Sequence, residues 1–115
     1  MTHEDKAWLA GLVEGEGSFS FQSNPSRLGR RIHPRFGISM TDEDVMMRAA
    51  GLMNAKACGP YRRPNRKPFW SIKLFGDVAL RFGLDMFPYM GERRQEQIAN
   101  QLELDMQRRE GIRYV

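Results

Sequence analysis

Two glutamates near the N-terminus have the type and spacing of ligands for a metal ion. Glu14 and Glu16 alternate with Gly15 and Gly17 where a helix that begins at Thr2 is predicted to end. Carboxylates at the negative end of a helix are unfavourable by about 0.3–1 kcal/mol at exposed sites. A divalent cation would offset this cost, and oxygen ligands without a Cys or His cluster favour Mg²⁺ or a similar hard ion. The alternative is a pair of solvated surface acids.

Basic residues are concentrated in two windows that contain no acidic residue. Residues 18–40 hold four arginines, and residues 55–76 hold six lysines and arginines. The rest of the chain has 8 positive against 14 negative charges, a net of −6, although the whole chain carries +4. This segregation favours a phosphate backbone as the partner, and the alternative is that both windows are solvated surface loops.

Hydrophobic periodicity predicts the elements that position these residues, in the order αββαββαα. The predicted elements are a helix from Thr2 that stops at Gly15 and Gly17, strands at 17–22 and 32–40, a helix from 41 or 42 to 53, strands at 58–63 and 69–75, and helices at 77–87 and 92–109, with loops at 24–29 and 64–68. Alternation within the strands places Phe19, Phe21, Ile32 and Phe36 in a core. The helix at 77–87 is predicted to bury Val78, Leu80, Leu84 and Phe87.

The polar faces of all four predicted strands coincide with the two acid-free windows. The predicted fold class is therefore α+β: one αββαββα domain over residues 1–115, with a C-terminal helix added. Its four-stranded antiparallel sheet would pack one face on helices and present the other as a saddle for double-stranded DNA. The expected base-reading residues are Ser20, Gln22, Arg31, His33, Arg35, Arg62 and Lys73, and the residues expected to contact phosphate or bases are Arg27, Arg30, Arg63, Arg66 and Lys67.

Small residues follow one face of the first predicted helix. Ala7, Gly11 and Gly15 are spaced at i, i+4 and i+8, with Ala10 beside them. A glycine inside a helix costs about 0.5–1 kcal/mol relative to alanine, so Gly11 requires an explanation. Small residues allow another backbone to approach closely, either inside the protomer or in a symmetric contact between two copies.

The nonapeptide Leu9–Gly17, read as Leu-Ala-Gly-Leu-Val-Glu-Gly-Glu-Gly, resembles the signature of the LAGLIDADG homing endonucleases, with five of nine letters identical. The following Ser-Phe, the order αββαββα and the segment Phe87-Pro88-Tyr89-Met90, followed by Arg93-Arg94-Gln95, are also similar to that family. The resemblance covers about residues 5–100.

The resemblance implies a site-specific double-stranded DNA endonuclease, a hydrolase encoded by an intron or another mobile element. Since the chain has one motif copy, it implies a homodimer on a nearly palindromic site, joined through Ala7, Ala10, Gly11 and Glu14. Glu16 and the Gly15 carbonyl match the positions that hold Mg²⁺ or a similar cation such as Mn²⁺. Arg93 matches a catalytic basic residue.

Three departures from the family pattern keep other functions open. Glu16 replaces the usual Asp, Arg93 stands where Lys is common, and Met40 or Thr41 stands where a polar side chain is frequent. These departures favour a descendant that binds DNA or RNA without cleaving it, as a regulator or a splicing maturase. A third hypothesis, a module that only dimerises through its first helix, does not explain the basic windows.

Cysteine content and hydropathy indicate the expected compartment. Cys58 is the only cysteine, so an internal disulfide is impossible. No apolar run has the length of a membrane span, and Met-Thr-His-Glu-Asp does not resemble the start of a signal peptide. The expected location is the cytoplasm, or the matrix of an organelle, without secretion or a membrane partner.

Overall fold

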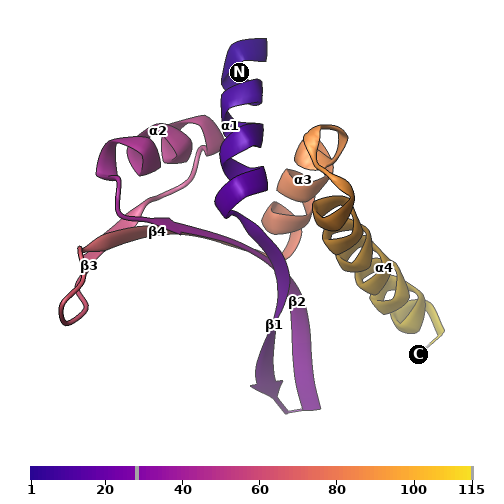
Figure 1. Cartoon of the computed structure of the whole chain (residues 1–115). Coiled ribbons are helices and arrows are strands. Elements are labelled where there is room, and N and C mark those ends of the chain that lie inside the picture. The colour runs from indigo at the N-terminus through magenta and orange to yellow at the C-terminus, as the bar shows by residue number, and fades with distance from the viewer. Residues whose placement is uncertain (28, 115) are drawn as a thin grey trace. The chain divides into compact units, whose positions relative to one another are not determined.

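The computed structural model describes the backbone of residues 1–27 and 29–114, with their side chains except at positions 26, 30 and 110–114. Its elements are α1 (His3–Glu16), β1 (Ser18–Ser26), β2 (Gly29–Met40), α2 (Glu43–Met53), β3 (Cys58–Tyr61), β4 (Phe69–Phe75), α3 (Gly76–Met86), the 3₁₀ turn η1 (Phe87–Tyr89) and α4 (Glu92–Tyr114) (Figure 1). The strands form one open antiparallel sheet in the order β1-β2-β4-β3. The predicted α+β class and the order of elements are therefore confirmed.

The chain forms two compact units, each made of two separate stretches of sequence. The α1–α2 unit contains Met1–Ser18 and Gly37–Leu74, and the α3–α4 unit contains Phe19–Phe36 and the chain from Phe75 onward. Strand β2 contributes to both units because the division falls between Phe36 and Gly37.

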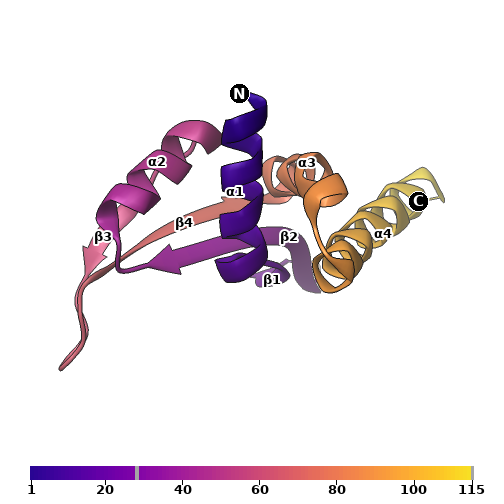
Figure 2. The same cartoon turned by 45° about the horizontal axis from the view of Figure 1, so that its top comes forward.

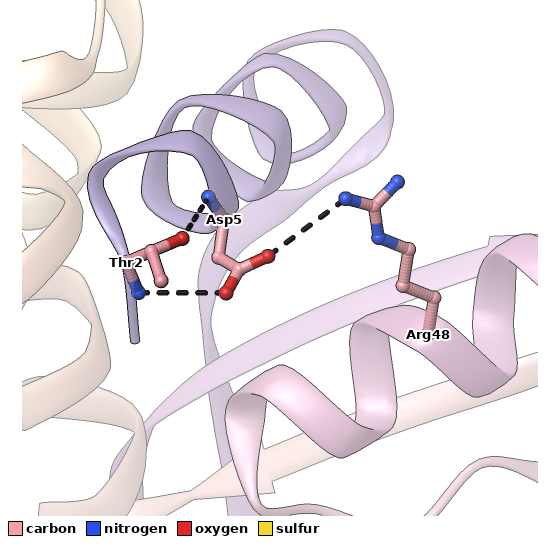
Figure 3. A network of polar contacts seen from close by, with 3 residues as sticks. All are labelled: Thr2, Asp5 and Arg48. Atoms are coloured by element: carbon pink, nitrogen blue, oxygen red, sulfur yellow. Dashed lines mark hydrogen bonds and ion pairs between the residues drawn. The ribbon is translucent and has the colours of Figure 1, made fainter.

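In the α1–α2 unit, α1 begins with a capping box, as the sequence predicts. The Thr2 hydroxyl accepts a hydrogen bond from the Asp5 N–H at 3.1 Å, and the Asp5 carboxylate accepts one from the Thr2 N–H at 3.4 Å. Arg48 of α2 pairs with the same carboxylate at 3.8 Å (Figure 3) and lies over the Trp8 ring, 4.0 Å from its centroid. These contacts join α1 to α2 above a core that includes Leu9 and Met46.

In the α3–α4 unit, α3 and α4 lie side by side, joined through η1 (Figure 1). Phe19, Phe36 and Phe82 form an aromatic cluster in which the centroids of Phe36 and Phe82 are 4.8 Å apart. A Cβ built at Gly83 would lie 3.3 Å from Ile98 of α4 and 3.4 Å from Phe19 of β1. The absence of a side chain at Gly83 therefore permits the close approach of α3 to these two elements.

Because Gly83 allows this close packing, α3 buries a different face from the predicted one, and only Leu80 of the residues expected there is buried. Val78 is 60% exposed and Leu84 is 44% exposed, while Ala79 and Met86 are buried together with Leu80 and Gly83. Phe87 is also exposed. Close helix packing selected the face with small residues, and hydrophobicity alone does not detect this preference.

The hairpin of β1 and β2 is longer than predicted. Residues 24–26 continue β1 instead of forming a loop, because β1 is an edge strand and tolerates Pro25 there. Phe21 and Ile32, both expected in the core, are each 41% exposed, since they lie beyond the aromatic cluster around Phe19.

Other boundaries also differ from the prediction. Strand β3 ends at Tyr61 rather than residue 63, α3 begins at Gly76, and α4 continues five residues further, to Tyr114. Strand β4 has the predicted bounds. Within the described residues, no helix combines the length and the apolar character that a membrane span requires.

Candidate nucleic-acid interface

Helix α1 ends on an exposed carboxylate. Glu16 is its last residue, and the Gly17 N–H closes the helix by donating to the Val13 carbonyl at 2.8 Å. Glu14 and Gly15 are also exposed, and this fully described helix has no basic residue in its last turn. Within residues 1–27 and 29–114, no group of three or more His, Cys, Asp or Glu side chains forms a metal cluster. The end of α1 therefore offers acidic oxygen donors to a ligand that approaches from outside the protomer.

The small residues of α1 do not serve a tight contact inside the protomer. A Cβ built at Gly11 or Gly15 would meet no heavy atom of another part of the described structure within 4 Å. Ala7 is exposed as well, whereas Ala10 is 6% exposed and belongs to the protomer core. Ala7, Gly11 and Gly15 thus form an open stripe of small residues on α1.

The first group of predicted DNA-binding residues lies on the β1–β2 hairpin. Arg27 and Arg31 are exposed, and the side chain of Arg30 lies outside those described. The half-buried members of this group are Ser20, Gln22, His33 and Arg35. On β2, the alternate residues Pro34, Phe36 and Ile38 are buried, so Arg31, His33 and Arg35 occupy the opposite face, as predicted.

Helix α4 supports this hairpin through hydrogen bonds to its backbone. Gln101 is fully buried, and its Nε2 donates to the carbonyls of Ser20 and Arg35 at 2.8 and 2.9 Å. Gln97 accepts from the Phe19 N–H at 3.3 Å, and Arg108 donates to the Ile32 carbonyl at 2.9 Å. Positions 97, 101 and 108 share one face of the helix. Strand backbone near several predicted DNA-binding residues is therefore held by α4 side chains.

The second group lies in the α1–α2 unit. Arg62, Arg63, Arg66 and Lys67 are exposed in the loop 62–68, which extends beyond β3 and β4 in both views (Figures 1 and 2). Arg63 lies over the Phe69 ring, 4.3 Å from its centroid. Lys73 is exposed on β4. The loop therefore presents four cations outside the regular strands.

Arg93 is exposed in the first turn of α4 and belongs to the α3–α4 unit, whereas Gly15 and Glu16 belong to the α1–α2 unit. Arg48 of α2, another cation of the α1–α2 unit, is engaged by Asp5 and Trp8.

Sequence reasoning did not single out Asn24, Phe75, Gln101 or Arg108. Gln101 had no signal because a buried glutamine in a charged helix looks like a solvated one. Phe75 is the last residue of β4 and is 45% exposed. Its signal in the sequence is its place in the acid-free window 55–76, two residues after Lys73 and so on the same face of the strand.

The described fold is similar to those of solved DNA-cleaving enzymes. No protein-family model matches the sequence, and no curated protein matches it significantly. The group I intron-encoded homing endonuclease I-CeuI, solved with DNA, aligns with a TM-score of 0.68 and 18% identity over 90% of this chain. I-CvuI, solved with a DNA target and Mg, aligns with a TM-score of 0.65 and 18% identity over 88% of this chain. I-TnaI aligns with a TM-score of 0.69 and 17% identity over 92% of this chain. This chain spans 54% of I-CeuI, 68% of I-CvuI and 74% of I-TnaI. The chain therefore has the fold of the LAGLIDADG homing endonucleases, as its nonapeptide motif predicts.

Proposed function

We propose that this chain is a site-specific double-stranded DNA endonuclease that hydrolyses phosphodiester bonds as a homodimer with a divalent cation. The observation that carries the proposal is the position of the motif: its helix ends on the exposed Glu16, directly before a strand of the basic hairpin. The fold supports the proposal, since I-CeuI and I-CvuI have similar folds and were solved with DNA.

The end of α1 fits a hard cation such as Mg²⁺ or Mn²⁺. Its donors are the Glu16 carboxylate and the Gly15 carbonyl, and no basic residue of this helix turn competes with a cation. Mg²⁺ is usually bound through one or two carboxylates together with water and substrate phosphates, so a small donor set is sufficient. When bound, the cation would supply Lewis-acid chemistry at the scissile phosphate.

The other residues of the proposed site bind the DNA. A guanidinium stabilises negative charge on a phosphate and does not transfer protons, so this is the role of Arg93. The cations of the hairpin and of the loop 62–68 neutralise phosphates, and strand side chains such as Gln22 contact base edges.

A second copy of the chain would complete the enzyme. The stripe of Ala7, Gly11 and Gly15 has no close neighbour in the described protomer, although a mid-helix glycine costs about 0.5–1 kcal/mol relative to alanine. A close symmetric contact between two α1 helices accounts for this cost. It also gives the protein the two-fold symmetry of a palindromic DNA site.

Substitution of Glu16 tests the catalytic proposal. We expect Glu16→Gln to abolish cleavage of a randomised duplex library in Mg²⁺, because the neutral amide is a poor ligand for the cation, while DNA binding persists. The readout is sequencing of cut ends, with Glu4→Gln at the other end of α1 as the control that still cleaves. Cleavage by Glu16→Gln at the wild-type rate would refute the assigned role. Sequence-specific binding by a wild-type protein that never cleaves would support the non-cleaving descendant instead.

Substitution of Gly11 tests the homodimer. Gly11→Ala and Gly51→Ala each add a methyl group at a helical position where nothing lies within 4 Å in the described protomer. Both should favour helix formation, but only Gly11→Ala should weaken the dimer, by fivefold or more as a rough estimate for an overpacked contact. Sedimentation equilibrium measures the difference. Equal dimer dissociation constants for wild type and Gly11→Ala would place the interface elsewhere.

A further inference from the structure

A hollow in the α3–α4 unit lies on the hairpin that carries predicted DNA-binding residues. It has a volume of about 350 Å³ and is lined by Gln22 and Asn24 of β1, His33 of β2, and Phe75 and Gly76 at the junction of β4 and α3. Strands β1 and β2 are neighbours in the sheet, and β4 is the next strand after β2. The hollow therefore combines side chains from three adjacent strands.

The chemistry of the lining residues discriminates among base pairs. In the major groove, Arg or Lys typically reads guanine, Asp or Glu accepts from cytosine, Asn or Gln pairs with the N6 and N7 atoms of adenine, and an apolar side chain such as Phe contacts the thymine methyl group. Among the described residues that line the hollow, two are amides, one is Phe, one is His and none is Arg, Lys, Asp or Glu. The two amides and Phe75 match an A·T pair.

The Gln22 amide forms a hydrogen bond with a residue of its own strand. Its Nε2 donates to Asn24 Oδ1 at 3.2 Å. A primary amide has a second N–H and a carbonyl oxygen, so this bond uses only one of its hydrogen-bonding groups. The other N–H and the oxygen are the donor and the acceptor that adenine N7 and N6 require. Asn24 acts as a positioning residue for Gln22.

Phe75 supplies the apolar wall of the hollow. Its side chain is 45% exposed, and Gly76 follows it with φ of 64°, a left-handed conformation that favours glycine. The turn that presents Phe75 therefore depends on Gly76. Phe21 is a matched aromatic residue, 41% exposed, that precedes Gln22 in β1 and so faces the opposite side of the strand.

We propose that this hollow reads one A·T base pair in each half of the DNA site, with Gln22 on adenine and Phe75 against the thymine methyl group. The inference rests on the proposed function, because it requires that the hairpin binds DNA in the major groove. That groove is wide enough for a two-stranded β-ribbon such as β1 and β2.

The experiment removes one methyl group from the DNA and one side chain from the protein. Wild-type protein first selects bound duplexes from a randomised library with Ca²⁺ in place of Mg²⁺. Each selected thymine is then replaced singly by deoxyuracil, which lacks only the methyl group. We expect one position in each half-site where deoxyuracil weakens wild-type binding by about fourfold. At that position, deoxyuracil should not weaken DNA binding by the Phe75→Ala variant. The Phe21→Ala variant should lose as much affinity on the deoxyuracil replacement as wild type does.

Gln22→Ala provides the second arm of the experiment. At the same base pair it should lose discrimination against G·C by roughly fivefold to a hundredfold. The inference is overturned if Phe75→Ala retains the deoxyuracil penalty at every position, or if Gln22→Ala retains the wild-type discrimination at the position that depends on Phe75. In either case the DNA-binding part of the proposed function stands, because specific DNA was bound. If wild-type protein enriches no DNA sequence, the proposed function fails, and the inference fails with it.

Discussion

The two units of the chain hold their basic residues in different ways. In the α3–α4 unit, the backbone of the β1–β2 hairpin accepts hydrogen bonds from the side chains of Gln101 and Arg108 of α4 and donates one to Gln97 of the same helix. In the α1–α2 unit, four of the eight lysines and arginines lie on the loop 62–68, where Arg63 lies over the Phe69 ring and the other three are exposed. Base readout requires fixed side-chain directions, whereas neutralising a phosphate tolerates movement. Under the proposed function, we therefore expect the hairpin to read the base sequence and the loop to bind phosphates only.

The largest expected effect comes from removing the buried support of the hairpin. Gln101→Leu leaves the carbonyls of Ser20 and Arg35 without the donor that now reaches both. An unsatisfied buried polar group costs about 1–3 kcal/mol, so the free energy of unfolding should fall by about that amount. Urea denaturation measures it. A stability equal to that of wild type would show that these hydrogen bonds do not support the hairpin.

Ser71 of β4, in the other unit, supplies the control for that measurement. Its side chain is 5% exposed, and its Oγ has no hydrogen-bond partner among the described residues. Removing a buried hydroxyl that makes no hydrogen bond should cost little, so Ser71→Ala is expected to change stability by less than about 0.5 kcal/mol. A large loss of stability in Ser71→Ala would mean that burial of a polar group, and not the loss of its hydrogen bonds, determines how much such a substitution destabilises the fold.

An intermediate effect is expected at the end of α4, where two adjacent arginines have different partners. Arg108 donates to the Ile32 carbonyl of the hairpin, whereas Arg109 pairs with Asp105 of its own helix at 2.9 Å. The hydrogen bond from Arg109 to Asp105 and the attraction of that charge raise the pKa of Arg109. Arg108→Ala should accelerate hydrogen exchange of the β2 amides by about twofold to tenfold, and Arg109→Ala should not. Equal hydrogen-exchange rates of the β2 amides in both variants would show that Arg108 does not stabilise the hairpin.

The smallest effect is expected from one exposed cation of the loop. Arg66→Ala should weaken binding to all DNA sequences alike, by a few-fold near physiological salt. The slope of log affinity against log salt concentration should become shallower by about 1, because one phosphate contact is lost. Titrations at several salt concentrations measure the slope. A slope unchanged from wild type would place Arg66 away from the phosphates.

Local signals in the sequence were sufficient for much of the fold. Strand β4 has its predicted bounds because a run rich in aromatic and aliphatic residues is limited by Pro68 and Gly76. The capping box at Thr2 and Asp5 and the helix end at Glu16 also depend on neighbouring residues only. The acidic end of α1 and the cations of both windows could therefore be placed before the structure was known.

Features that depend on contacts between distant segments could not be predicted in this way. The packing face of α3 depends on the space that Gly83 leaves for Ile98 and Phe19. The support from Gln101 depends on two strands that are remote in sequence. Phe75 joins Gln22 and His33 only because β1, β2 and β4 are adjacent in the sheet.

The most direct test of whether the hairpin reads bases and the loop 62–68 binds phosphates is a base-preference profile for three proteins on one randomised duplex library. Wild type, Arg108→Ala and Arg66→Ala are each allowed to bind the library, and the bound DNA is sequenced at two salt concentrations. The account predicts that Arg108→Ala flattens the preference at a defined set of positions in each half-site, while Arg66→Ala retains the wild-type profile at lower affinity. The opposite result, in which Arg66→Ala changes the preferred bases and Arg108→Ala does not, would contradict it.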